Sequence, residues 1–434
     1  MDMSLEPYDF YETESYVDTL PYLDPVSSGS FVTYDHRTFG DPVNHYFNKV
    51  LGVQYLLGDK KTLFYIMTNS VYSPNPTACR KAVEMLSDVH IRRIQNPIQP
   101  ALDSEAALKL KRIQTWLESQ DSTDPDTAMA ALHYISLYLF DGGSGAWEGF
   151  LKVAGKYVSK ILYHGGYTSP LDALQSCSEK DAFVIKTVLW FDVLASITTQ
   201  RPPYFFSAID EMFSPSQVRI ENEQSSMMNP MGCENIVLWA LTKTSELSYW
   251  KKLQQARGSL SIPDLVKRAG MIEQYLEHST STIYDYDPSL AGFSADKAAC
   301  SRYHASELFR TSALLFLRSV VSGNYPHVKE IKVAVHDTMA CIRNIPPDAE
   351  IRRSVVRSTV FSFFICGSLT DDQRNLEYLG RILTHESGGE SGVGNCNHIY
   401  ALLCELWKKR DPNVPGPIEW RECLKQNDSQ FLLV

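Results

Sequence analysis

The segment from Trp190 to Phe206, WFDVLASITTQRPPYFF, constrains the fold more than any other part of the chain. Apolar residues in its first half recur at spacings of three and four, which indicates one apolar face of a helix: Trp190, Val193, Leu194 and Ile197. Asp192 and Ser196 fall on other faces. Pro202 and Pro203 then end the helix, because proline lacks an amide donor and restricts the residue before it. Aromatic residues follow at once, so we expect the helix exit to be anchored in a core: Tyr204, Phe205 and Phe206.

From about Phe39 onward, apolar residues follow a helical period almost without interruption, and no segment shows the rhythm of a sheet. The sequence therefore predicts an all-α fold, a large irregular multi-helix domain of about fourteen helices over residues 39–434. The expected helices span residues 42–57, 75–90, 103–119, 124–141, 144–163, 179–198, 232–251, 262–284, 294–321, 325–344, 351–367, 371–386, 393–410 and 417–425. The long connection 199–231 is expected to be irregular.

Several helix ends carry signals with a known mechanism. Asp103 and Ser178 stand where a side-chain oxygen caps the first free amides of a helix. Residues 370–373, Thr-Asp-Asp-Gln, have the form of a capping box. Glycine or proline pairs mark the stops at residues 142–143, 165–166 and 346–347.

Residues 1–38 differ in composition from the rest. No Lys or Arg occurs between Met1 and Asp35, where acidic residues interleave with aromatic residues and leucines. Self-repelling charge disfavours a stable fold, so we expect a disordered acidic arm. Such alternation is also typical of disordered activation segments, which leaves two interpretations open: an activation segment, or an arm that simply lies on the surface.

Composition limits the compartment and the chemistry. Nine cysteines are scattered without any Cys-x-x-Cys pair, which favours reduced, mostly buried thiols over a zinc site. An acidic N-terminus and apolar runs shorter than the ~20 residues of a membrane span predict neither a signal peptide nor contact with a membrane. We therefore expect a protein that stays inside the cell.

The charge distribution disfavours direct contact with nucleic acid. The formal net charge is −10, whereas domains that grip phosphates usually carry a basic stripe. The densest basic patches, at residues 92–93, 352–353 and 408–410, are each too short for one.

Motifs that carry chemistry are incomplete. The glycine cluster at residues 388–394 has no lysine of a phosphate loop, and Ser144 and Ser391 miss the spacing of a hydrolase elbow. Cys396 and His398 alone do not make a metal site. We therefore predict no catalytic, cofactor-binding or metal-binding residues and no cofactor, and leave ligand-binding and partner-binding residues unassigned.

Asp371 and Asp372 raise one enzymatic alternative, an all-α, metal-dependent, terpene-cyclase-like enzyme. Such enzymes bind magnesium diphosphate through carboxylates one helical turn apart. Arg374 and Asn375 stand where the second carboxylate would be, so helix capping explains these residues more economically.

Four blocks together resemble the regulatory, or middle-homology, domain of fungal-specific transcription factors of the binuclear zinc cluster family. They are residues 130–162 with Phe140-Asp141-Gly142 and Trp147, residues 190–206, residues 307–323 with Glu307-Leu-Phe-Arg310, and residues 361–420 with Trp407 and Trp420. The resemblance covers about residues 40–425. The family's six-cysteine zinc cluster is absent, so either the cluster lies upstream in a longer parent chain or this chain regulates without touching DNA.

The resemblance implies a transcriptional regulator in the nucleus that is not an enzyme. Its implied partners are the transcription machinery or co-regulator proteins, with a homodimer and a small-molecule effector as further candidates. A non-catalytic scaffold that carries neither ligand nor activation function is the other alternative.

Overall fold

The chain is all-α over the residues that the computed structural model describes, which confirms the predicted fold class. These residues are 41–73, 77–97, 99–120, 124–215, 222–278, 296–386, 393–410, 416–424 and 430–434. The predicted arm, Ser391 and most of the 388–394 glycine cluster lie outside them. The described residues also include one antiparallel ladder between β1 (Ser144–Gly145) and β2 (Gln430–Phe431), although the sequence predicts no sheet. A two-residue strand leaves no periodic signal, which is why this pair escapes prediction.

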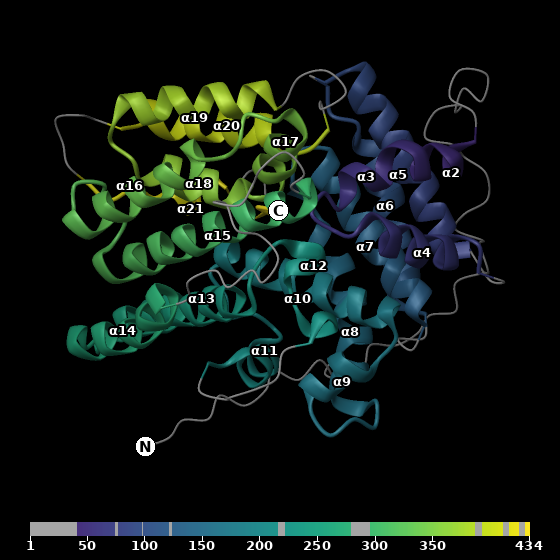
Figure 1. Ribbon diagram of the computed structural model, residues 1–434, viewed down its shortest axis with the longest axis horizontal. Coiled ribbons are helices and arrows are strands. Elements are labelled where there is room, and N and C mark those ends of the chain that lie inside the picture. The colour runs from purple at the N-terminus through teal and green to yellow at the C-terminus, as the bar shows by residue number, and fades with distance from the viewer. Residues whose placement is uncertain are drawn as a thin grey trace.

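The first part of the chain forms a group of helices that Figure 1 shows in purple and blue. They are α2 (Pro42–His45), the π-helical turn η1 (Tyr46–Val50), α3 (Leu51–Gln54), α4 (Lys60–Val71), α5 (Thr77–Gln95), α6 (Ser104–Glu118), α7 (Pro125–Phe140), α8 (Trp147–His164) and α9 (Pro170–Ser176). The predicted helices omit α4 and α9, so the described part contains more helices than the fourteen expected.

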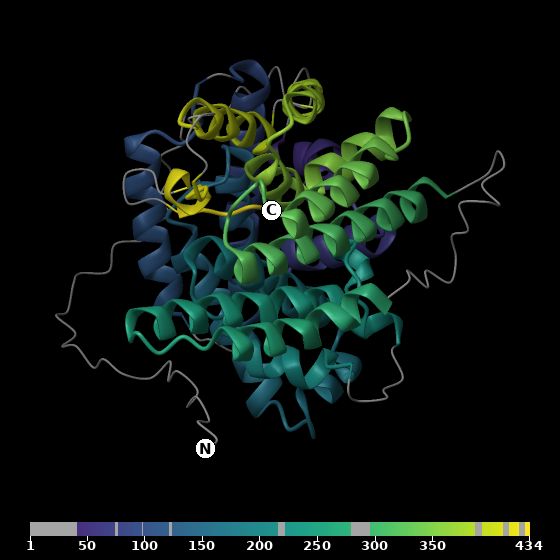
Figure 2. The same ribbon diagram turned by 90° about the vertical axis from the view of Figure 1, so that its left-hand side faces the viewer.

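The last part of the chain forms a second group, drawn in teal, green and yellow. It contains α11 (Phe206–Phe213), the 3-10 turn η2 (Glu223–Ser225), α12 (Met228–Met231), α13 (Asn235–Ala256), α14 (Ile262–His278), α15 (Lys297–Ser322), α16 (Lys329–Arg343), α17 (Ala349–Ser358), α18 (Val360–Leu369), α19 (Gln373–His385), α20 (Cys396–Lys408) and α21 (Trp420–Cys423). In the view turned by 90°, α13 and α14 run side by side (Figure 2). The predicted irregular connection 199–231 thus holds α11, η2 and α12.

Helix caps follow the sequence signals at two sites and depart from them at a third. Asp103 accepts a hydrogen bond from the Ala106 amide at 2.9 Å, and Ser178 accepts one from the Asp181 amide at 3.1 Å, which confirms both caps. The predicted capping box at residues 370–373 is wrong. Asp372 is the N-cap of α19 and accepts from the Arg374 amide, whereas Thr370 ends α18.

The predicted helix 351–367 is interrupted. Thr359 has φ −119° and ψ 31°, which separates α17 from α18, and its hydroxyl donates back to the Val355 carbonyl at 2.7 Å. The same side-chain bond occurs at Thr187, Thr242 and Thr338 inside unbroken helices, so it accompanies the break at Thr359 and does not cause it.

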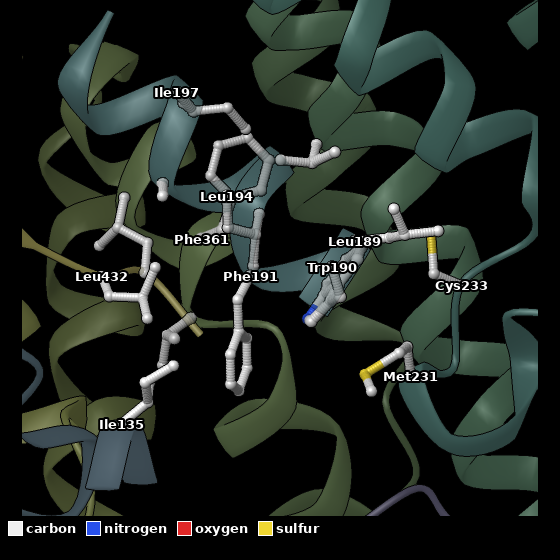
Figure 3. Packing of buried hydrophobic residues seen from close by; sticks show 14 of the residues in the cluster. Ile135, Leu189, Trp190, Phe191, Leu194, Ile197, Met231, Cys233, Phe361 and Leu432 are labelled. Atoms are coloured by element: carbon white, nitrogen blue, oxygen red, sulfur yellow. The ribbon is translucent and has the colours of Figure 1, made fainter. Parts of the chain in front are cut away.

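Helix α10 (Glu179–Thr199) lies between the two groups and is buried on all sides. It packs against α7, α8 and α9 on the N-terminal side and against α12 and α13 on the C-terminal side. The single apolar face predicted for it is therefore too narrow, because Asp192 and Ser196 are each only 1% exposed. Figure 3 shows Trp190, Phe191 and Leu194 among side chains of other segments, including Ile135, Phe361 and Leu432.

Length and composition alone would let α10 cross a membrane, contrary to the expectation that every apolar run is too short. Its apolar window has a mean hydropathy of 1.5 and is 94% buried inside the domain. Burial among other helices is the usual situation of a core helix.

The exit of α10 is held by a buried ion pair. Arg201 Nη1 lies 3.1 Å from Asp192 Oδ1, and the Phe205 amide donates to Asp192 Oδ2 at 3.0 Å. Phe205 is 3% exposed, which confirms the predicted anchor at this residue, whereas Tyr204 is 41% exposed and packs against Arg201 instead of the core. Burial raises the pKa of Asp192, and the nearby Arg201 opposes that rise.

We predict that Asp192→Asn destabilises the domain by about 2–4 kcal/mol, because the amide nitrogen cannot accept a hydrogen bond and Arg201 loses its partner. Urea unfolding followed by circular dichroism measures the change. Asp264→Asn removes the exposed pair with Arg268, whose side chains are both 43% exposed, and should cost below about 1 kcal/mol. Equal losses in the two variants would contradict the anchoring role of Asp192.

Candidate functional site

A cavity of about 90 Å³ lies where the N-terminal helices, α10 and the C-terminal helices meet. This central cavity is partly open, and its lining comes from segments far apart in the sequence. The residues that line it include Gln54, Tyr55, Ser136, Trp190, Met231, Arg357 and Asn395. Polar groups therefore face a space inside a core that is otherwise largely apolar.

One wall of the central cavity contains a hydrogen-bond network around Gln54. Its Oε1 accepts from the Tyr46 hydroxyl at 2.9 Å, and its Nε2 donates to Ser136 Oγ at 2.8 Å. Nε2 also lies 3.1 Å from Nδ1 of His133, which must act as acceptor because an amide NH₂ only donates. Ser136 in turn donates to the Leu132 carbonyl at 3.0 Å. With Nδ1 as acceptor, Nε2 of His133 carries the proton, and this buried atom has no hydrogen-bond partner. The network therefore pairs Gln54 and Ser136 but leaves one donor of His133 open.

Two hydrogen-bond donors on residues that line the central cavity have no partner: Arg357 Nη1 and the Tyr55 hydroxyl. Arg357 is 8% exposed, and its Nη2 donates to the Val393 carbonyl, while its Nη1 has no hydrogen-bond partner. Arg357 also forms no ion pair within the described part of the chain, and burial lowers the pKa of its guanidinium. The Tyr55 hydroxyl is buried close to Ser136 without a well-formed hydrogen bond. Burial raises the pKa of Tyr55, so this phenol stays protonated.

The first resemblance block forms a junction next to the central cavity. The carboxylate of Asp141 accepts from the amides of Ala101 and Leu102 at 2.7 and 2.9 Å. Gly142 has φ 111°, and a Cβ there would lie 2.4 Å from the ring of His398, so only glycine fits. The block therefore ties α7 to the loop before α6 and to α20.

The same block also holds the end of the chain. The Gly143 carbonyl accepts from the Leu432 amide at 2.8 Å, and Trp147 Nε1 donates to the Gln430 carbonyl at 2.9 Å. Asn395 Nδ2 donates to the Val434 carbonyl at 2.8 Å. These bonds place residues 430–434 against the central cavity.

The other blocks converge on α10. Trp190 meets Phe309 of α15 edge to face, with ring centroids 4.9 Å apart, and Arg421 donates to the Ile197 carbonyl at 2.9 Å. Trp420 lies against Phe316 and Phe364. The segments singled out from the sequence are therefore contacts between distant parts of the core.

The residues whose sequence patterns suggested an enzymatic role make ion pairs, a helix cap or a strand pairing in the structure. Asp371 lies 3.2 Å from Lys332 and 2.9 Å from His327 on the surface, and Asp372 caps α19. Ser144 pairs with Phe431 in the ladder. Over the described residues, no three His, Cys, Asp or Glu side chains come together as a metal site, and all nine cysteines are free.

The sequence did not point to Arg357, Gln54 or Tyr55. Arg357 follows the buried Ser354 by three residues on α17, so it shares an inward face. A basic residue on an inward face is the one sequence signal that could have found it. Gln54 and Tyr55 carry no such signal.

The sequence profile of the fungal specific transcription factor domain matches residues 43–434. The chain belongs to this family. The domain therefore carries the fold of a transcription-factor module, and no solved structure matches it.

The relatives that this chain resembles are also named as transcription factors or regulators. The domain is 26% identical over 263 residues to the ustiloxin B cluster transcription factor of Aspergillus flavus, covering 57% of this chain and 41% of that protein. It is 24% identical to the trichothecene biosynthesis transcription regulator of Trichoderma arundinaceum over 47% of this chain and 44% of the relative. The transcription factor ntnD of Nectria sp is 28% identical over 53% of this chain and 37% of its own length. The matches thus span less than half of each relative.

Acid should weaken the domain through the buried histidines. Burial lowers the pKa of His133 to about 3, and burial next to His45 lowers that of His90 to about 3. The unfolded chain binds these protons near pH 6.5, so stability that is present above pH 6.5 is lost as the pH falls toward 3. We predict that His133→Asn removes on the order of 1–2 kcal/mol of the stability lost between pH 7 and pH 5.

Urea unfolding at pH 7, 6 and 5 measures this pH dependence. His336, whose side chain is 78% exposed, provides the control, and His336→Asn should keep the wild-type slope. A slope in His133→Asn identical to that of the wild type would show that His133 does not contribute.

Proposed function

We propose that this domain is the regulatory part of a transcription regulator that controls genes of a biosynthetic pathway in the nucleus. It acts through contacts with the transcription machinery or co-regulator proteins, responds to a small effector and catalyses no reaction. Family membership supports the class, and the names of the relatives from Aspergillus flavus and Trichoderma arundinaceum support a biosynthetic target.

The central cavity is the observation that carries this proposal. A buried donor without a partner costs free energy, and a ligand that pairs it stabilises the arrangement that binds it. Because the cavity is lined by α7, α10, α12, α17 and the start of α20, a bound effector favours one packing of these segments. Such a population shift changes the surface that a partner protein meets.

The surroundings of the basic residues support regulation without DNA contact by this domain. Arg93 is 1% exposed and donates to the Gln99 carbonyl at 2.9 Å. Arg410 donates to the Ser368 and Thr370 carbonyls at the end of α18. Two of the three short basic patches therefore direct an arginine to backbone carbonyls rather than to a phosphate surface.

Two alternatives make different predictions. A terpene-cyclase-like enzyme would show magnesium-dependent turnover of a prenyl diphosphate that is lost in Asp372→Ala. The capping role of Asp372 speaks against that enzyme. A scaffold would keep the fold and show neither an effector response nor an activation function.

A reporter assay tests the proposed regulation. Residues 1–434 fused to a foreign DNA-binding domain should raise transcription above the DNA-binding domain alone. A fusion of residues 39–434 should give lower output, because acidic residues interleaved with aromatics are typical of activation segments. Background output from both fusions, with both proteins expressed and nuclear by fluorescence, would leave only the scaffold.

A further inference from the structure

We propose that the central cavity binds the carboxylate of a small organic acid, held by Arg357 Nη1 and the Tyr55 hydroxyl. This inference rests on the proposed function, since it assigns a chemical class to the effector of that cavity.

The positive charge of Arg357 in the site favours a negatively charged ligand. Arg357 is buried, and no ion pair neutralises it within the described residues. Arg353 nearby adds positive charge, while Glu386, which attracts the guanidinium, bonds instead to His385 at 3.0 Å. A buried charge is stable when it is paired and hydrogen-bonded, so the vacant position at Nη1 favours an anion.

The unpaired atoms select the functional group. Nη1 of arginine only donates, and the Tyr55 hydroxyl is a second buried donor without a hydrogen-bond partner, although Ser136, which accepts from Gln54 and donates to Leu132, lies close to it. A carboxylate has two acceptor oxygens and no donor. It can therefore pair both groups and leaves no donor of its own without a partner.

The volume of the cavity and its apolar lining residues limit the size and polarity of the rest of the ligand. An apolar cavity of 150 Å³ holds benzene, which has six non-hydrogen atoms, so about 90 Å³ has room for about four. Trp190 and Met231 also line the cavity and add apolar surface to it. A short aliphatic acid fits this combination, and the partly open mouth allows a longer acid to extend outward.

Calorimetry on the 434-residue chain in a zwitterionic buffer tests the inference with three probes: propionate, the neutral isostere propionamide, and inorganic phosphate. We expect propionate to bind at least about tenfold more tightly than propionamide. Arg357→Gln should weaken propionate about 10- to 100-fold, since it removes a charge-assisted hydrogen bond. Tyr55→Phe, which keeps the ring that contacts Phe183, should weaken it about 3- to 10-fold.

Arg374→Gln, at an exposed arginine on α19, is the matched control and should bind like the wild type. Circular dichroism confirms folding, and Tyr55→Phe keeps the test decisive if Arg357→Gln does not fold. Equal binding of propionamide, wild-type affinity in Tyr55→Phe and any folded Arg357 variant, preference for phosphate, or no binding of propionate would each overturn the carboxylate assignment. If a neutral metabolite raises the melting temperature and changes reporter output, the proposed function stands without this inference. If reporter output stays at background, the proposed function itself fails.

Discussion

The burial of α10 on every side is the constraint on which the other contacts depend. A helix without a solvent face needs apolar cover all round, and each large apolar side chain that is fully buried contributes about 1.5–3 kcal/mol. Polar groups on such a helix need partners inside the protein. Ser196 and Thr198 donate to carbonyls three residues earlier, and Asp192 finds Arg201 and the Phe205 amide. Both groups of helices therefore pack against the same helix, α10.

The central cavity is a by-product of this arrangement and not a pocket within one element. Its walls are the middle of α10 at Trp190 and Phe191, the ends of other helices and the links between them. The Gln54 network pairs the polar groups of Gln54 and Ser136 on one wall, whereas Arg357 and Tyr55 leave donors open on another. That asymmetry distinguishes the cavity from a simple packing defect, which would be apolar.

The period of apolar residues was enough to predict the fold class and most helices, because each helix buries a face. The same spacing and an Asp59 cap mark α4, so its omission has no physical cause in the sequence. The break at Thr359 interrupts a run of residues that periodicity alone predicts as one helix. The central cavity was beyond prediction, because Tyr55, Ser136 and Arg357 come together only through tertiary packing.

The pairing of β2 with β1 has a consequence for how the gene tolerates change. Leu432 and Leu433 are at most 1% exposed, and the backbones of Leu432 and Gln430 are hydrogen-bonded to Gly143 and Trp147 of the first block. A nonsense codon only a few triplets before Val434 would therefore remove interior material, not a dispensable tail. A change of reading frame within codons 430–434 should therefore be as harmful as damage to the middle of this domain.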